Sequence, residues 1–188
     1  MARPRTIDRE HLLDVAQALV AQAGTGALTF GALAKAAGLA KASVQSVFGT
    51  REALIEAILE RWMAFDEMRF AANVAPDADK RTRIRAHVRL LAAEKAEDSH
   101  RIAGLMVALA GAGHQASSIL QWYDRRIDAF AVDGAQDRLL RIAFLAADGA
   151  FFVRHLANYP MDDAVWEDIH RDIDALLQGT LPADGTAA

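Results

Sequence analysis

Two Glu-x-x-His pairs are the strongest candidates for catalytic chemistry in this sequence of 188 residues: Glu97 with His100, and Glu167 with His170. Di-iron helical bundles use this motif twice, together with one further glutamate from each of two other helices. The predicted helix over 136–158 contains no glutamate, and a predicted helix break falls within the first pair. A metal-dependent bundle enzyme is therefore the alternative to the interpretation developed below, and the supply of ligands argues against it.

Other kinds of catalysis lack the residues that they need. The absence of cysteine excludes disulfides, iron–sulfur clusters, thiolate zinc sites and cysteine nucleophiles. Gly24-Thr25-Gly26 follows a predicted helix rather than a strand, so it does not form a dinucleotide-binding loop. The sequence has no phosphate-binding Gly-Lys-Ser/Thr loop and no Gly-x-Ser-x-Gly motif. We therefore expect a protein that is not an enzyme and that needs no cofactor and no metal.

A short predicted helix over 41–48 carries side chains suited to nucleic acid. Val44 and Phe48 are four residues apart, so both face the core. The opposite face then presents Lys41, Ala42, Gln45 and Ser46. A helix with small and polar residues near its N-terminus can enter the major groove of DNA and bring side chains to base edges. The amide of Gln45 can bind adenine bidentately, and simple exposure to solvent is the alternative.

The elements that must position this helix have their own signals. A predicted helix over 30–37 begins after the Thr29 cap, and only Gly38-Leu39-Ala40 separates it from the helix over 41–48. Gly38 supplies the positive φ that so tight a turn requires. Two short helices joined in this way form a helix-turn-helix.

The distribution of charge agrees with a nucleic-acid partner. The whole chain has a net charge of −4, but residues 1–51 carry +3 and the remainder carries −7. This asymmetry suggests a basic module that faces a polyanion and an acidic body with another task. A purely structural adaptor would leave the basic hairpin unexplained.

Three stretches and one glycine resemble the TetR family of bacterial transcriptional regulators: REHLLDVA over 9–16, Gly24, LAKAAGLAKASV over 33–44 and FGTREAL over 48–54. The resemblance covers about the first 60 residues without gaps, and spacing, glycines, caps and apolar positions agree together. It implies a homodimeric repressor that a small-molecule effector releases from a near-palindromic DNA operator.

The resemblance also implies which residues contact DNA. Lys41 and Arg51 would neutralise phosphates, Thr29 would contact one, and an arm containing Arg3 and Arg5 would reach the adjacent groove. Solvated charges without a partner are the alternative for these basic residues. The family usually has aromatic residues where this chain has Gln45 and Val47. The predicted DNA-binding set is Arg3, Arg5, Thr29, Lys41, Ala42, Ser43, Gln45, Ser46 and Arg51.

The fold class predicted from the whole sequence is all-α. Strand signals are nearly absent, and about nine helices are expected, over 8–23, 30–37, 41–48, 50–70, 80–96, 102–110, 117–131, 136–158 and 163–177. We expect a helix-turn-helix domain over 1–50, a helical domain for effector binding and dimerisation over 51–178, and a disordered tail over 179–188.

The predicted helix over 136–158 is apolar on nearly every face, so we expect it to be buried all round. In a chain of this size, that burial requires a second subunit, in a four-helix bundle with the helix over 163–177. A monomer with this helix at its centre is the alternative. Arg141, Asp148 and His155 share one stripe and would pair across the dimer or face a cavity. The predicted dimer interface is Arg141, Leu145, Asp148, Phe151, His155, Val165, Ile169, Ile173 and Leu176.

Aromatic and methionine residues between 62 and 152 are the candidates for an effector pocket. They are Trp62, Met63, His100, Met106, His114, Trp122, Tyr123 and Phe152, and ordinary core packing is the alternative for each. The sequence does not identify the small molecule. It begins without a signal-peptide pattern, and the central stretch over 102–115 is too short to span a bilayer. We therefore expect a cytoplasmic protein.

Overall fold

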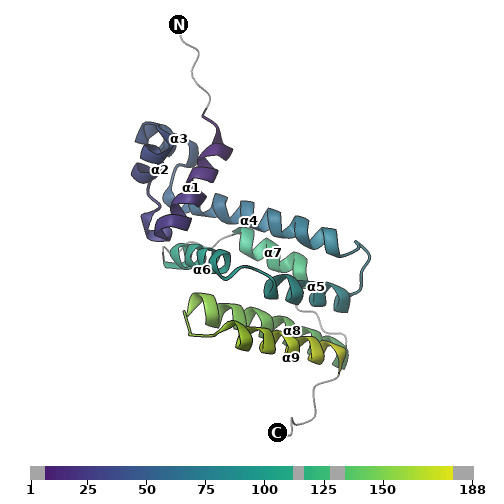
Figure 1. Cartoon of the computed structure of the whole chain (residues 1–188). Helices are drawn as coiled ribbons and strands as arrows, with labels where there is room; N and C mark the ends of the chain where they lie inside the picture. Colours follow the sequence, from purple (N-terminus) through teal and green to yellow (C-terminus); the bar gives the residue numbers. More distant parts are fainter. Residues whose placement is uncertain (1–6, 112–116, 128–133, 180–188) are drawn as a thin grey trace. The chain divides into compact units, whose positions relative to one another are not determined.

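The computed structural model describes residues 7–111, 117–127 and 134–179. Within these ranges the chain forms nine α-helices and no strand (Figure 1), which confirms the predicted all-α class. None of the helices in this part of the chain is long and apolar enough to cross a membrane.

The first three helices begin and end at their capping residues. They are α1 (Arg9–Ala23), α2 (Phe30–Ala37) and α3 (Lys41–Phe48), and the short helix η1 (Thr25–Ala27) follows α1. The Asp8 carboxylate accepts hydrogen bonds from two backbone N–H groups of the first turn of α1. Thr29 caps α2, and Gly38 ends it at φ 66°, in the left-handed region that favours glycine. The predicted limits of α2 and α3 are confirmed.

The next four helices are α4 (Arg51–Asn73), α5 (Lys80–Ala92), α6 (Ala96–Gly111) and α7 (Ser117–Ile127). The predicted break within 97–101 is wrong, because α6 already begins at Ala96. Glu97 and Asp98 lie in its first turn, where negative charge interacts favourably with the helix dipole. The break lies instead between Ala92 and Ala96. The expected continuation of α7 beyond 127 lies outside the described residues.

The last two helices are α8 (Ala135–Phe151) and α9 (Asp163–Gln178), which lie side by side in Figure 1. The helix predicted over 136–158 is not regular throughout, because a π-helical segment, η3 (Phe152–Leu156), follows α8. The Asp162 side chain caps α9, and Gly179 ends it at φ 73°. The predicted tail after Gly179 lies outside the described residues.

The chain divides into two compact units. The head unit contains residues 1–63 and 101–119, and the body unit contains residues 64–100 and 120–188. The predicted domain limit at 50/51 marks the start of α4, whereas the limits of the compact units fall inside α4, α6 and α7. The core of the body unit is formed by Ile84, Val88, Leu140, Ala143, Phe144, Ala147, Ile173 and Leu177.

Candidate functional site

The outward face of α3 is the candidate surface for nucleic acid. Val44 and Phe48 are buried against the head unit, as their spacing predicts. The exposed positions of the helix are Lys41, Ala42, Gln45 and Ser46, and Ser43 is half-buried beside them. The Ser46 hydroxyl donates a hydrogen bond to the Ser43 carbonyl over 2.7 Å. The side-chain amide of Gln45 therefore offers this face both an N–H donor and a carbonyl acceptor for a base.

Thr29 and Arg51, the other predicted phosphate contacts, have local partners. The Thr29 hydroxyl accepts the Ala32 N–H over 3.1 Å and so caps α2. The Arg51 guanidinium donates through Nε to the Leu28 carbonyl at 2.8 Å and through Nη2 to the Thr25 carbonyl at 3.0 Å. Arg51 is half-buried in this position, and its contact with a DNA phosphate stays a prediction. Arg3 and Arg5 lie outside the described residues.

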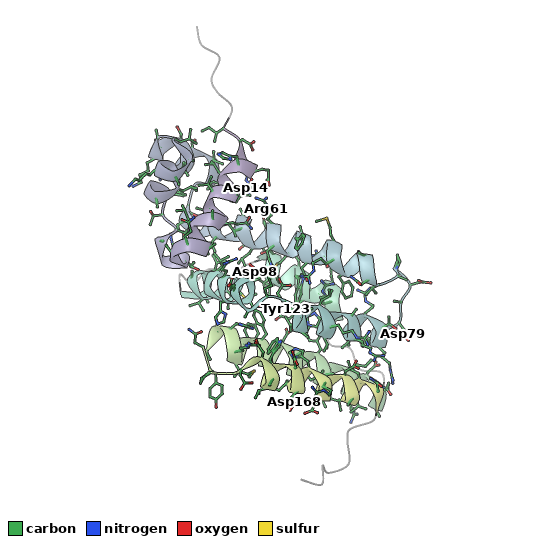
Figure 2. The ribbon with its side chains drawn as sticks, viewed as in Figure 1. Asp14, Arg61, Asp79, Asp98, Tyr123 and Asp168 are labelled. Carbon is green, nitrogen blue, oxygen red and sulfur yellow. The ribbon has the colours of Figure 1, made fainter. Side chains whose placement is uncertain are left out.

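An ion pair ties α1 to α4 within the head unit. Arg61 Nη2 lies 2.6 Å from Asp14 Oδ1, and Figure 2 shows the two side chains between the helices. The pair is largely exposed, so its contribution to stability is small. It contributes mainly to the position of α1 on α4.

The interior of the body unit contains a polar cluster that the sequence analysis missed in part. Asp148 of α8 accepts the Tyr123 hydroxyl at 2.6 Å and lies 3.0 Å from Nε2 of His87. Tyr123 is labelled in Figure 2. Burial and the charge of Asp148 raise the pKa of Tyr123. The phenol therefore stays protonated and remains a hydrogen-bond donor at neutral pH.

A second group of polar side chains joins α4 to α7. Asp66 accepts the Trp122 indole N–H at 3.0 Å and forms a buried ion pair with Arg126. The Arg126 guanidinium lies over the Phe70 ring, 3.7 Å from its centroid. The sequence signal that could have revealed this pair is a charged residue on an apolar helix stripe, since Asp66 lies between Met63 and Phe70.

The predicted pocket residues are divided between the two units. Trp62, Met63 and Met106 belong to the head unit, whereas His100, Trp122, Tyr123 and Phe152 belong to the body unit. His114 lies outside the described residues. In the body unit, the rings of Trp122 and Tyr123 touch at 5.0 Å between centroids, and both side chains bond to buried carboxylates. The surroundings of these two rings are thus more polar than those of an ordinary hydrophobic core.

The predicted dimer residues separate into an exposed and a buried set. Leu145 and Val165 are about half exposed, at 50% and 47%. Arg141 is exposed, and Ile169 and Leu176 are half-buried. The buried set is Asp148, Phe151, His155 and Ile173, which lie inside the protomer. The residues of the buried set therefore already have partners within the same chain, through a hydrogen bond, ring contacts or core packing.

The two Glu-x-x-His motifs do not form one site. His170 is buried and its Nδ1 lies 2.8 Å from the Trp166 carbonyl, while Glu167 is exposed. Within the described residues, no group of three histidine or acidic side chains is placed to hold a metal ion. The first motif instead brings His100 to His155, with 3.2 Å between their Nδ1 atoms.

The buried His155 predicts a dependence of stability on pH. Burial, the neighbouring His100 and the charge of Arg154 lower the pKa of His155 from 6.5 to about 4. The unfolded chain therefore takes up this proton near pH 6.5, and the folded chain only near pH 4. The contribution of His155 to the free energy of unfolding is fully present above pH 6.5. It is lost as the pH falls from 6.5 to about 4, with a limiting slope of about 1.4 kcal/mol per pH unit for one histidine.

Urea unfolding between pH 5 and 7.5 measures this effect. The expected result is a shallower pH dependence for His155→Gln than for the unchanged chain. Burial also lowers the pKa of His170, so part of the slope should remain in the variant. Identical slopes for the two proteins would show that His155 is not the group that titrates.

Comparison with known proteins extends these observations. The family model "Bacterial regulatory proteins, tetR family" matches residues 12–58, and the model "Tetracyclin repressor-like, C-terminal domain" matches residues 81–178. No protein with a curated description matches the chain.

Solved structures share the fold at low sequence identity. The fatty acid degradation regulator FadR from Bacillus halodurans has a TM-score of 0.64 at 16% identity, over 93% of this chain and 97% of that one. A TetR-family transcriptional regulator from Pectobacterium atrosepticum has a TM-score of 0.61 at 23% identity, over 94% and 95%. The multidrug binding protein EbrR, solved with imidazole, has a TM-score of 0.60 at 18% identity, over 97% and 99%.

The two family models follow the same order as the parts of the chain described above. The first covers most of the helix-turn-helix head, and the second covers α5 to α9 and just over half of the 188 residues. The chain therefore belongs to the TetR family of bacterial transcriptional regulators, with an N-terminal helix-turn-helix for DNA and a C-terminal helical domain.

Proposed function

We propose that this regulator is a homodimeric repressor that binds a near-palindromic operator through α3 and leaves it when a small molecule binds. The observation that carries the proposal is the division of α3 into two faces. Val44 and Phe48 fix one face in the head, and the exposed face carries a cation, a small apolar residue and an amide. Such a face fits the edges of bases in the major groove.

Each exposed residue of α3 has a distinct task in this proposal. Lys41, at the first position of the helix, neutralises a phosphate. Gln45 donates to and accepts from an adenine edge. Ser46 has its proton bonded to the Ser43 carbonyl, so its hydroxyl can only accept a hydrogen bond from a base. Ala42 is small enough to let the helix approach a thymine methyl group.

The apolar surface of α8, η3 and α9 supports the dimer. Ile142, Leu145 and Val165 are about half exposed in the single chain, and Val153 and Leu156 are also exposed. Exposed apolar side chains that gather on neighbouring elements are typical of protein interaction surfaces. A second copy of the same surface is the occupant we propose, because two heads related by a two-fold axis match a near-palindromic site.

The polar cluster of the body unit supports binding of a small molecule there. Trp122 and Tyr123 provide aromatic surface, and Asp66 and Asp148 provide buried carboxylates beside them. Apolar walls with a few placed polar groups are typical of small-molecule sites. Release from DNA then follows if the small molecule binds the unbound conformation more tightly than the DNA-bound one.

Selection from random duplex DNA with the purified chain tests the core of the proposal. Enrichment of a near-palindromic sequence is the expected result. A pool that remains random after repeated rounds at low salt would contradict sequence-specific DNA binding.

Two substitutions on α3 separate its two kinds of contact. Lys41→Ala should weaken binding to all duplexes and reduce the slope of log K against log salt by about 0.9, the value for one phosphate contact. Gln45→Ala should leave that slope unchanged and relax the preference at one or two base pairs, at a cost of about 1–3 kcal/mol for the preferred base. Titrations of operator and scrambled duplexes over a salt series measure both effects. If neither variant changes operator binding, α3 is not the recognition helix.

A further inference from the structure

The turn over residues 25–28 connects the first helix of the head to the recognition hairpin. It consists of η1 and Leu28, and the next residue, Thr29, is the cap of α2. Leu28 is fully buried. Because α2 begins directly after this turn and only three residues separate α2 from α3, a shift of the turn changes the position of α3 on DNA.

Arg51 holds this turn from the side of α4. Its Nε and Nη2 atoms donate to the carbonyls of Leu28 and Thr25, so one planar guanidinium binds both ends of the turn. A guanidinium provides several N–H donors in a fixed plane, and a lysine could not bind both carbonyls with that geometry. Arg51 thereby fixes the turn relative to the start of α4.

Gly104 of α6 lies close to the same turn, at the side chain of Thr25. A Cβ atom added at Gly104 would lie 2.9 Å from the Thr25 hydroxyl oxygen, closer than nonbonded atoms normally approach. The next nearest atom, the Thr25 Cβ, would lie at 4.0 Å, which is ordinary contact. Glycine inside a helix is less stable than alanine by about 0.5–1 kcal/mol. A glycine at this contact is therefore consistent with a requirement for close approach.

We propose that Arg51 and Gly104 are positioning residues that hold the turn over 25–28 and thereby set the affinity of α3 for its operator. Arg51 acts through the main-chain carbonyls of the turn and not through a DNA phosphate. The contact at Gly104 places α6 in this role, and α6 extends from the head unit into the body unit through residues 96–100. The proposal rests on the proposed binding of DNA by α3.

A salt series distinguishes positioning from phosphate contact. Arg51→Gln should weaken operator binding at least tenfold and leave the slope of log K against log salt unchanged. Lys41→Gln is the matched substitution, and its slope should fall by about 0.9. A fall in slope for Arg51→Gln equal to that of Lys41→Gln would overturn the proposal, as would an unchanged affinity.

A suppression experiment tests the other side of the turn. Gly104→Ala should weaken operator binding at least fivefold, while Thr25→Ala alone should stay within about twofold of the unchanged chain. The double variant should recover to within twofold, because removal of the Thr25 hydroxyl leaves the new methyl group at an ordinary distance. Gly111→Ala is the control in the same helix, because a Cβ there would meet no atom within 4 Å.

Helical content and the thermal midpoint of each variant show whether it is folded. If Gly104→Ala does not fold, the double variant and Arg51→Gln still decide the question. Normal operator binding by Gly104→Ala, or a double variant as weak as Gly104→Ala alone, would overturn the proposal. If the unchanged chain selects no duplex, the failure lies instead in the proposed function.

Discussion

Replacement of Asp148 by alanine is expected to lower the free energy of unfolding by about 3–5 kcal/mol, the cost of removing one partner from a buried polar network. Asp148 is 8% exposed, and its two oxygens bond to Tyr123 and face His87. Without the carboxylate, the partly buried hydroxyl of Tyr123 and the buried imidazole of His87 both lose this partner. The cavity left by the side chain adds to the loss.

Urea denaturation followed by circular dichroism measures this change, with an unchanged m value as the sign that two-state unfolding persists. Asp168→Ala is the matched control, because Asp168 is exposed on α9 and, among the residues that the structure describes, pairs only with the neighbouring exposed Arg171. The control should change stability by less than about 0.5 kcal/mol. Tyr123→Phe should give an intermediate loss of about 1–3 kcal/mol, since it removes one donor and no charge. Equal effects of Asp148→Ala and its control would contradict a network at the centre of the body unit.

The head of the fold could be predicted almost residue by residue, because its signals are local. The side chain of Thr29 and the left-handed Gly38 fix the limits of α2, and Gly49 ends α3, where the sequence places them. The two faces of α3 follow from the four-residue spacing of Val44 and Phe48. Each of these features depends on residues within one or two helical turns.

The remaining features depend on contacts between distant parts of the chain. Arg51 looks like a phosphate ligand in sequence, and only the fold brings the carbonyls of residues 25 and 28 within reach of its guanidinium. The start of α6 differs from the predicted break because a run of polar residues resembles a loop, whereas Glu97 and Asp98 favour a first helical turn. Arg141 and Asp148 are seven residues apart on one predicted stripe, yet one is exposed and the other buried.

The fold also divides the faces of the apolar helix predicted over 136–158. The pattern predicts burial all round, with a second subunit on one side; in the single chain, one side of α8 packs on the protomer core and another stays open. Phe144 and Ala147 are on the packed side, whereas Ile142 and Leu145 are on the open side. Sequence pattern reports that a face is apolar, and the fold decides whether the same chain or a partner covers it.

In the dimer proposed above, Leu145→Glu is therefore expected to separate the two chains and to weaken binding to the full operator by about 10²–10⁴-fold. Leu145 is 50% exposed on the open side of α8. In a two-fold dimer, this one substitution places two carboxylates, one from each chain, in an apolar interface. A charge buried there without a partner is unfavourable. Once dimerisation is lost, the second head no longer binds as part of the same molecule, so the gain from linkage disappears.

Sedimentation equilibrium and operator titrations measure these two effects on the same samples. Affinity for a single half-site should not change, because the substitution leaves α3 and the head unit untouched. Met68→Glu is the matched control: Met68 is 64% exposed on α4, so this substitution introduces the same charge at an exposed apolar position outside α8 and α9. The control should remain dimeric and bind the operator normally. A Leu145→Glu protein that stays dimeric, or a Met68→Glu protein that dissociates, would place the dimer contact elsewhere than on the open side of α8.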